Sequence, residues 1–309
     1  MNNKTKQAFS LIEISIVILI IGILVAGVTS GSRLITRMRI TSAQNLTKSS
    51  PVSTIKDLIV WVEPTLDESF DQAQVQQSFQ ITQWNDINPT TSTKYFFVRN
   101  QSSQITYETN GISGLPTIRF DGNTAIEGIT NRTGALFLSR STLVNDIIPL
   151  PTAIARMTIF VVLQNNLVSG GNVNYAFYNG NANINPQNGW GYFLHFPLNK
   201  RTLYFPQAGG SWYQSNNTIS RNPEILVVQY GGIGVGSLQV FVNGSSEPFP
   251  NNNWSSTNPT NFFILGNGNG TEIWNGFISE VIIFDRIINT EERKSVESYL
   301  AKKYSIKIS

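Results

Sequence analysis

The sequence predicts a mainly β protein, an antiparallel sandwich with a C-terminal helix, preceded by a long N-terminal transmembrane α-helix. Three observations support this prediction. One uninterrupted apolar run lies near the start, short runs rich in Val, Ile, Phe and Tyr fill the body, and an amphipathic segment closes the chain. A chain of 309 residues, 40% of them hydrophobic, is long enough for one large packed domain plus an extension.

The composition excludes several classes of function. Charged residues make up only 13% of the chain, and much of the net charge of +3 comes from basic residues beside the apolar run. These residues are Lys4, Lys6, Arg33, Arg37 and Arg39. The remainder shows no concentrated basic face, so we expect no nucleic-acid partner. The absence of Cys excludes disulfides, Cys-ligated metals and thiol nucleophiles.

The apolar run, FSLIEISIVILIIGILVAGV, covers residues 9–28. Twenty residues of helix span about 30 Å, which is the thickness of the hydrocarbon core of a bilayer. No charge lies between Glu13 and Arg33, so this run is predicted to cross a membrane. Glu13 itself lies four residues inside the run, where an ionised carboxylate is costly unless it has a partner.

The residues KQA-FSLIE, followed by the apolar helix, resemble the class III signal of type IV prepilins and type II secretion pseudopilins. This resemblance implies a prepilin peptidase that cleaves between Ala8 and Phe9 and methylates the new Phe9 terminus. The family usually has Gly where Ala8 stands. The resemblance also places the leader in the cytoplasm and the rest of the chain outside the bacterial inner membrane, although the Lys/Arg count alone favours the reverse.

By the same resemblance, Glu13 is the acid at the fifth mature position, and physical reasoning gives it a task. Glu13 lies about 6 Å along the helix axis from Phe9, so it can pair with the freed amine of a neighbouring subunit. Gly22 and Gly27 would let helices approach closely. We expect a leader over 1–8, a helix over 9–50 that frays through SAQNLTKSSP, and a linker over 51–56.

The body changes to short runs that alternate apolar and polar residues, as strands of a sheet with one wet face require. Seven Asn-Gly pairs and one Asp-Gly pair supply hairpin turns, and no βαβ rhythm is present. Strands are predicted at 58–63, 94–99, 117–120, 135–139, 158–164, 175–178, 191–196, 225–230, 238–243, 261–266 and 277–284.

The closing helix is predicted over 290–304. Thr290 is the expected N-cap, and Glu291 and Glu292 complement the positive end of the helix. One face carries Val296, Tyr299, Leu300 and Tyr304, so the helix should lie on the sandwich.

The body resembles the laminin-G-like, concanavalin A-like jelly-roll family. The segments that carry this resemblance are IVWVEPTLD (59–67), QWND (83–86), LPTIRFDG (115–122), VFVNG (240–244) and GFISEVIIFDRIINTEERKSVESYLAKKY (276–304). The resemblance implies a jelly-roll domain over 57–309, although the C-terminal disulfide frequent in that family is absent.

The acidic residues do not predict a catalytic pair, so we expect no enzyme. A retaining glycosidase needs two carboxylates about 5 Å apart. Glu280 and Asp285 are five residues apart on one strand, which points them to opposite faces. His195 is the only His, which excludes a multi-His metal site, and the remaining acidic cluster lies in a predicted loop. Its members are Asp67, Glu68 and Asp71.

Aromatic side chains in Asn- and Gly-rich segments predict glycan binding, because aromatic faces stack on sugar rings. The alternative is that most of these rings fill the core or hold loops in place. The candidates are Trp190, Trp212, Trp254 and Trp274. Asp121, Asn267 and Asn269 could ligate calcium through oxygen, although their spacing matches no known loop. No other cofactor is expected.

These observations favour a pilin-like or pseudopilin-like filament subunit that displays a head for binding glycan or surface protein. Its expected partners are other pilin subunits, a prepilin peptidase/methyltransferase and inner-membrane lipid. Two alternatives stay open: a membrane-tethered glycan hydrolase of the same fold, and a tethered lectin that does not polymerise. The sequence leaves a pilus, a secretion pseudopilus and a DNA-uptake filament equally open.

Overall fold

The computed structural model describes most of the chain. The described residues are 11–92, 94–99, 105–121, 136–139, 156–166, 173–180, 189–195, 199–205, 211–231, 238–249, 263–266 and 273–309. The chain divides into two compact units, Met1–Ser42 and Ala43–Ser309.

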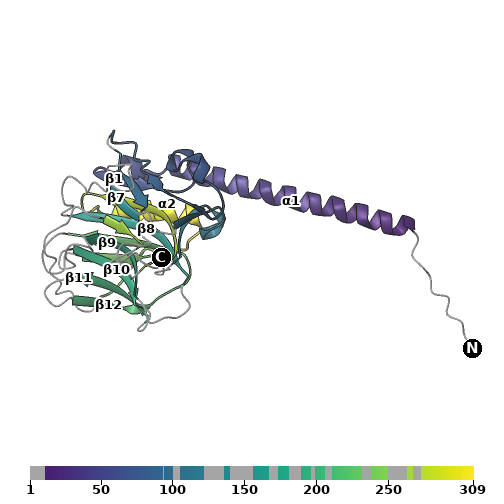
Figure 1. Ribbon diagram of the computed structural model, residues 1–309. Helices are drawn as coiled ribbons and strands as arrows, with labels where there is room; N and C mark the ends of the chain where they lie inside the picture. Colours follow the sequence, from purple (N-terminus) through teal and green to yellow (C-terminus); the bar gives the residue numbers. More distant parts are fainter. Residues whose placement is uncertain are drawn as a thin grey trace, which may run out of the picture. The chain divides into compact units, whose positions relative to one another are not determined.

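Helix α1 (Leu11–Lys48) is one continuous α-helix (Figure 1). The segment SAQNLTK, expected to fray, stays helical because Ala43 and Thr47 are buried within the second unit. The segment 51–56, expected to be a linker, is packed as well. It forms the 3-10 turn η1 (Pro51–Thr54), and Val52 is completely buried in an apolar cluster.

The body is built from two antiparallel sheets (Figure 1). The first sheet has nine strands in the described part of the chain, eight of them forming one continuous order. In spatial order these are β15 (Ser245–Ser246), β14 (Leu238–Val242), β13 (Glu224–Tyr230), β8 (Met157–Asn165), β17 (Asn275–Phe284), β6 (Thr117–Asp121), β5 (Ile105–Glu108) and β2 (Phe79–Gln80), with β1 (Leu58–Val62) paired to β17.

The second sheet has eight strands in the same described ranges. Their order is β12 (Ser211–Thr218), β11 (Lys200–Phe205), β10 (Gly189–His195), β9 (Val173–Gly180), β16 (Phe263–Leu265), β7 (Leu136–Ser139), β4 (Phe96–Arg99) and β3 (Gln83–Asn85). Three 3-10 turns complete the body: η2 (Asp67–Ser69), η3 (Gln72–Gln74) and η4 (Ile112–Gly114).

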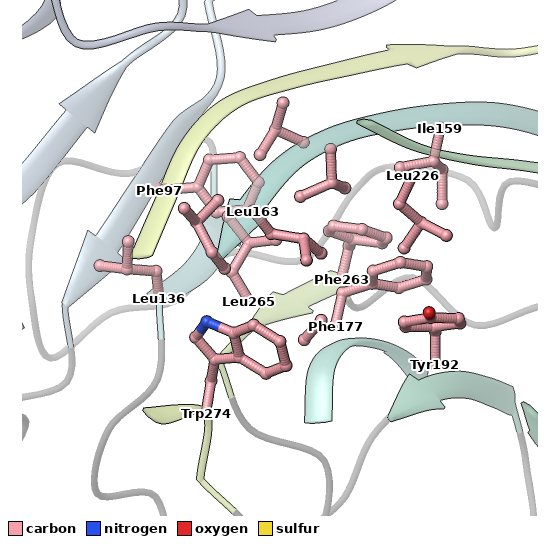
Figure 2. Close-up of a cluster of buried hydrophobic side chains, with 14 of the residues drawn as sticks. Phe97, Leu136, Ile159, Leu163, Phe177, Tyr192, Leu226, Phe263, Leu265 and Trp274 are labelled. Atoms are coloured by element: carbon pink, nitrogen blue, oxygen red, sulfur yellow. The ribbon is translucent and has the colours of Figure 1, made fainter. Parts of the chain in front are cut away.

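The sandwich interior lies between the two sheets. Phe177 of β9 stacks on both Phe263 of β16 and Tyr192 of β10, with ring centroids 5.6 and 6.1 Å apart (Figure 2). Leu163 and Leu226 of the first sheet belong to the same buried cluster. Along β8, Ile159, Val161 and Leu163 enter this interior, whereas Phe160 and Val162 lie in a second cluster on the other face, as the period of two of a strand requires.

The other face of the first sheet is covered by helix α2 (Thr290–Tyr304). Val296, Leu300 and Tyr304 of this helix form a second buried cluster with residues of β8, β13 and β17. The N-cap is Asn289, one residue earlier than expected. Its side chain accepts from the Glu292 N–H, and the Glu292 side chain accepts from the Asn289 N–H, which is a complete capping box.

The predicted fold class is confirmed: a long N-terminal helix, two antiparallel sheets and a C-terminal helix. A strand lies at each of the eleven predicted positions. Strands β2, β3, β5, β11, β12 and β15 were not predicted.

Candidate functional site

The N-terminal helix carries the residues that the sequence assigns to processing and assembly. Ala8 and Phe9 lie outside the described residues. Glu13 lies in the first turn of α1 and is exposed, as is every residue from Leu11 to Ser30. Such a helix is long and apolar enough to cross a membrane.

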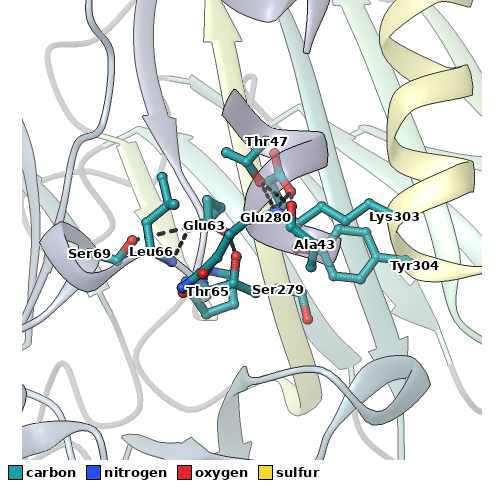
Figure 3. Close-up of polar contacts among 12 residues, drawn as sticks. Ala43, Thr47, Glu63, Thr65, Leu66, Ser69, Ser279, Glu280, Lys303 and Tyr304 are labelled. Atoms are coloured by element: carbon teal, nitrogen blue, oxygen red, sulfur yellow. Dashed lines mark hydrogen bonds and ion pairs between the residues drawn. The ribbon is translucent and has the colours of Figure 1, made fainter. Parts of the chain in front are cut away.

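A buried polar network lies where α2, β17 and the segment after β1 meet (Figure 3). Lys303 of α2 is at its centre and has no exposed side-chain area. Its Nζ lies 2.7 Å from Glu63 Oε2 and 2.8 Å from Glu280 Oε2, and both glutamates are also completely buried. The amine donates a third hydrogen bond, of 2.7 Å, to Thr47 Oγ1 in the last turn of α1.

Neutral donors surround Glu280. Trp61 Nε1 and the Tyr299 hydroxyl donate to Oε1 at 2.7 and 2.8 Å, and the Tyr304 hydroxyl donates to Oε2 at 3.0 Å. Burial and the nearby Glu280 charge raise the pKa of both tyrosines well above the ordinary value, so their hydroxyls keep their protons. Glu280 is therefore held by four donors and is not open to a substrate.

Glu63 is fixed by the chain that follows it. The Thr65 and Leu66 N–H groups donate to its two oxygens at 2.9 and 2.6 Å, and the Thr65 hydroxyl adds a bond of 2.6 Å. Burial opposes ionisation of Glu63, but the charge of Lys303 and these hydrogen bonds outweigh it and lower its pKa. Burial likewise opposes the Lys303 charge, yet the two glutamates raise its pKa.

A second buried ionic cluster closes one edge of the sandwich. Arg201 of β11 lies between the sheets and pairs with Glu224 of β13 at 2.5 Å and with Glu247 at 3.4 Å. Ser215 of β12 and Asn217 donate to Glu247, the latter at 2.9 Å. Burial raises the pKa of Glu224, and the Arg201 charge offsets part of that rise. The cluster links an edge strand of one sheet to the other sheet.

The four candidate sugar-binding tryptophans differ in where the structure places them. Trp274 is completely buried in the sandwich interior, so the expectation that it binds sugar is wrong (Figure 2). Trp190 occupies β10 and Trp212 occupies β12. Trp254 lies outside the described residues.

Trp212 belongs to one cross-strand row of the second sheet. Its Cα pairs with Tyr204, which pairs with Gly191, which pairs with Tyr178. Tyr178 alternates with the interior residue Phe177, so its ring lies on the opposite side of the strand, where it is nevertheless buried and packs edge-on against Tyr175. A Cβ at Gly191 would meet the Tyr178 ring at 2.7 Å, so glycine makes room for it.

The remaining candidates do not gather into a site within the described ranges. Asp121 ends β6, whereas Asn267 and Asn269 lie outside those ranges, so calcium binding stays a prediction. No group of three or more His, Cys, Asp or Glu there could hold a metal. Asp285 is exposed while Glu280 is buried, and His195 ends β10.

Sequence reasoning missed the roles of Lys303, Glu63 and Arg201. Lys303 follows Tyr299 by four residues along α2, so the two side chains share the buried face of the helix. That spacing was the available signal. For Arg201, the available signal was its position two residues before Leu203 on β11, because residues two apart in a strand lie on the same face.

The comparisons with known proteins match two parts of the chain separately, the N-terminal helix and the β-sandwich body. Residues 3–29 match the profile described as the prokaryotic N-terminal methylation motif. Among curated proteins none matches the chain.

Solved structures resemble the body at low sequence identity. The binding domain of Paraclostridial Mosquitocidal Protein 1 superposes with a TM-score of 0.50 at 12% identity, covering 80% of this chain and 52% of that one. Trypanosoma rangeli sialidase in complex with 2,3-difluoro-KDN gives 0.50 at 10% identity, covering 89% and 39%. The chain thus spans about half or less of these structures, and the likeness concerns the fold alone. This protein carries a prokaryotic N-terminal methylation motif on a long apolar helix, followed by a β-sandwich head.

Proposed function

We propose that this chain is a pilin-like or pseudopilin-like filament subunit of a type IV pilus or type II secretion system. The observation that carries the proposal is the methylation motif at 3–29, which overlaps the exposed apolar part of α1. An apolar helix surface of this length needs lipid before assembly and neighbouring helices afterwards. The subunit would be held in the bacterial inner membrane, with its leader in the cytoplasm and its head outside.

In this proposal the prepilin peptidase cleaves between Ala8 and Phe9 and methylates Phe9. The freed amine and Glu13 of a neighbouring subunit then pair in an apolar environment. Pairing the two charges removes the cost of burying each alone and fixes the axial stagger between subunits. Glu13 is thus proposed as the assembly residue.

Replacing Glu13 with Gln is expected to keep membrane insertion and to lower filament incorporation by more than about tenfold, since a lost ion pair at low dielectric exceeds 1.4 kcal/mol. The measurement is the fraction of subunit in sheared filaments or crosslinked assemblies, relative to the fraction in membranes. Ser15→Ala, a neutral change in the same apolar segment, is the matched control. Normal incorporation of Glu13→Gln would contradict the proposed pairing.

For the head we propose glycan binding on the second sheet and its loops, by Trp190, Trp212 and Trp254. What supports this is the backbone register of the second sheet, in which Trp212 of β12 is paired with Tyr204 of β11. Aromatic rings suit the flat faces of sugar rings, on which they stack. A surface protein that carries glycans would be recognised in the same way.

Glycan-array binding of the purified head-containing chain tests this part. Trp190→Ala and Trp212→Ala are each expected to weaken the retained glycan about tenfold, the loss of one aromatic stacking contact. Trp274→Phe, a change in the interior, should leave the affinity of the folded protein unchanged. Unaltered glycan affinity in both alanine variants would contradict glycan binding by Trp190 and Trp212. Release of reducing sugar would instead favour the glycan hydrolase.

A further inference from the structure

The Lys303 network holds an amine against two carboxyl groups in a buried interior, and the function proposed above gives it no role. Lys303, Glu63 and Glu280 have no exposed side-chain area, and the amine lies 2.7 and 2.8 Å from one oxygen of each glutamate. Two carboxylates around one ammonium leave a formal charge of −1 in this interior. Joining the ammonium to one carboxylate as a neutral amide removes two of the three buried charges, each of which is costly to bury. The formal charge stays at −1 on Glu63, which the N–H groups of Thr65 and Leu66 and the Thr65 hydroxyl hold.

We propose that Lys303 and Glu280 condense to an intramolecular amide bond, which covalently joins α2 to β17. The nucleophile is Lys303 Nζ and the electrophile is the Glu280 carboxyl carbon. Glu63 is the base that accepts the proton from the attacking nitrogen.

The two oxygens of Glu280 have different surroundings that suit different tasks. Oε1 accepts from Trp61 Nε1 at 2.7 Å and from the Tyr299 hydroxyl at 2.8 Å. Two neutral donors on one oxygen form an oxyanion hole for the tetrahedral intermediate. Oε2 lies 2.8 Å from Lys303 Nζ and 3.0 Å from the Tyr304 hydroxyl, so it can receive protons and leave.

Glu63 is fixed in the position that a base requires. Its Oε2 lies 2.7 Å from Lys303 Nζ, while the N–H groups of Thr65 and Leu66 hold both oxygens in place. These donors also stabilise the carboxylate, so Glu63 stays the anion when Glu280 becomes neutral.

The atoms and charges of the step balance. A proton passes from the Lys303 ammonium to Glu280 Oε2, and the neutral amine then forms a C–N bond to the carboxyl carbon. The tetrahedral intermediate carries its negative charge on Oε1. Glu63 takes a proton from the nitrogen and returns it to the leaving oxygen, the C–Oε2 bond breaks, and one water departs. One ammonium and one carboxylate become a neutral amide, and no oxidant or reductant is consumed.

Two physical terms govern the rate and the equilibrium. Holding the reacting groups in contact supplies an effective molarity on the order of 10⁵ M or more, which favours condensation where water is excluded. The ionised pair is the resting state, so the neutral pair that reacts is a minor species. The bond therefore forms slowly, after the head has folded.

The test is the intact mass of the purified full-length chain under denaturing conditions. We expect a mass lower than that of the sequence by one water, about 18 Da, once any leader removal and methylation are counted. Tandem mass spectrometry should find a branched tryptic peptide that joins the Glu280 segment to Lys303, without cleavage after Lys303. A folded wild-type chain with the full mass would overturn the proposal.

Three variants separate this bond from other losses of water. Lys303→Arg keeps the cation but removes the nucleophile, so its mass should be full, and a water loss that persists in it would count against the bond. Glu280→Gln should lose ammonia and reach the same final mass as the crosslinked wild type. Glu63→Gln should slow the mass change at least about 100-fold, the contribution of a general base. Formation at the wild-type rate would exclude Glu63 as the base.

Discussion

Replacing Lys303 with Met is expected to lower the free energy of unfolding of the head by about 3–5 kcal/mol. The methionine leaves Glu63 and Glu280 buried without their cation, 2.7 and 2.8 Å from where the ammonium was. It also removes the hydrogen bond to Thr47 that holds the last turn of α1 within the head. Where Lys303 and Glu280 are crosslinked, the variant loses the covalent bond in addition. Urea unfolding followed by circular dichroism measures the change.

The adjacent Lys302 provides a matched control for this variant. Lys302 is exposed in the same helical turn, so Lys302→Met changes the same residue type and the same charge without emptying the network. We expect it to stay within about 0.5 kcal/mol of the wild type. Adding Glu63→Gln and Glu280→Gln to Lys303→Met should recover part of the loss, because no charge is then buried alone. A Lys303→Met head as stable as the Lys302→Met head would refute this role.

The second large effect is expected at Arg201. Arg201→Met should also cost about 3–5 kcal/mol, because it leaves Glu224 and Glu247 buried between the sheets without their shared cation. Burial already raises the pKa of Glu224 with Arg201 present, so without the arginine this carboxyl should take up a proton at still higher pH. The measurement is thermal or urea unfolding at neutral pH.

Arg119 supplies the control, since it lies on strand β6 with an exposed side chain. Arg119→Met removes the same charge from the surface and should change stability by no more than about 0.5 kcal/mol. The triple variant with Glu224→Gln and Glu247→Gln should be more stable than Arg201→Met alone. If the Arg201→Met and Arg119→Met variants have the same unfolding midpoint, the Arg201 cluster does not stabilise the edge of the sandwich.

The strands that could be predicted are those whose residues enter a core. More than half of the residues in each of β8, β13 and β17 are Val, Ile, Leu or Phe, because both faces of the first sheet are covered. The missed strands β11 and β12 lie at an edge of the second sheet and carry polar residues such as SNNT. Their pairing depends on partners distant in sequence, which no local pattern reveals.

The same distinction explains the candidate sites. The membrane helix and its acid at Glu13 could be predicted, because the signal is contiguous in the sequence. The Lys303 network brings together Thr47, Glu63, Glu280 and the closing helix, over more than 250 positions of sequence. For Trp274 the local sequence was misleading. An aromatic residue in a Gly- and Asn-rich segment suggests a sugar contact, whereas tertiary packing places it in the interior.

The most direct test of the filament proposal is the N-terminal residue of the chain recovered from cell membranes and sheared filaments. Mass spectrometry of the first peptide is expected to show a chain that begins at N-methylated Phe9, with residues 1–8 absent. Deletion of the prepilin peptidase should restore the longer form. Recovery of the chain with its first eight residues intact from cells with an active peptidase would contradict the proposal, and the protein would then be a tethered β-sandwich that does not assemble.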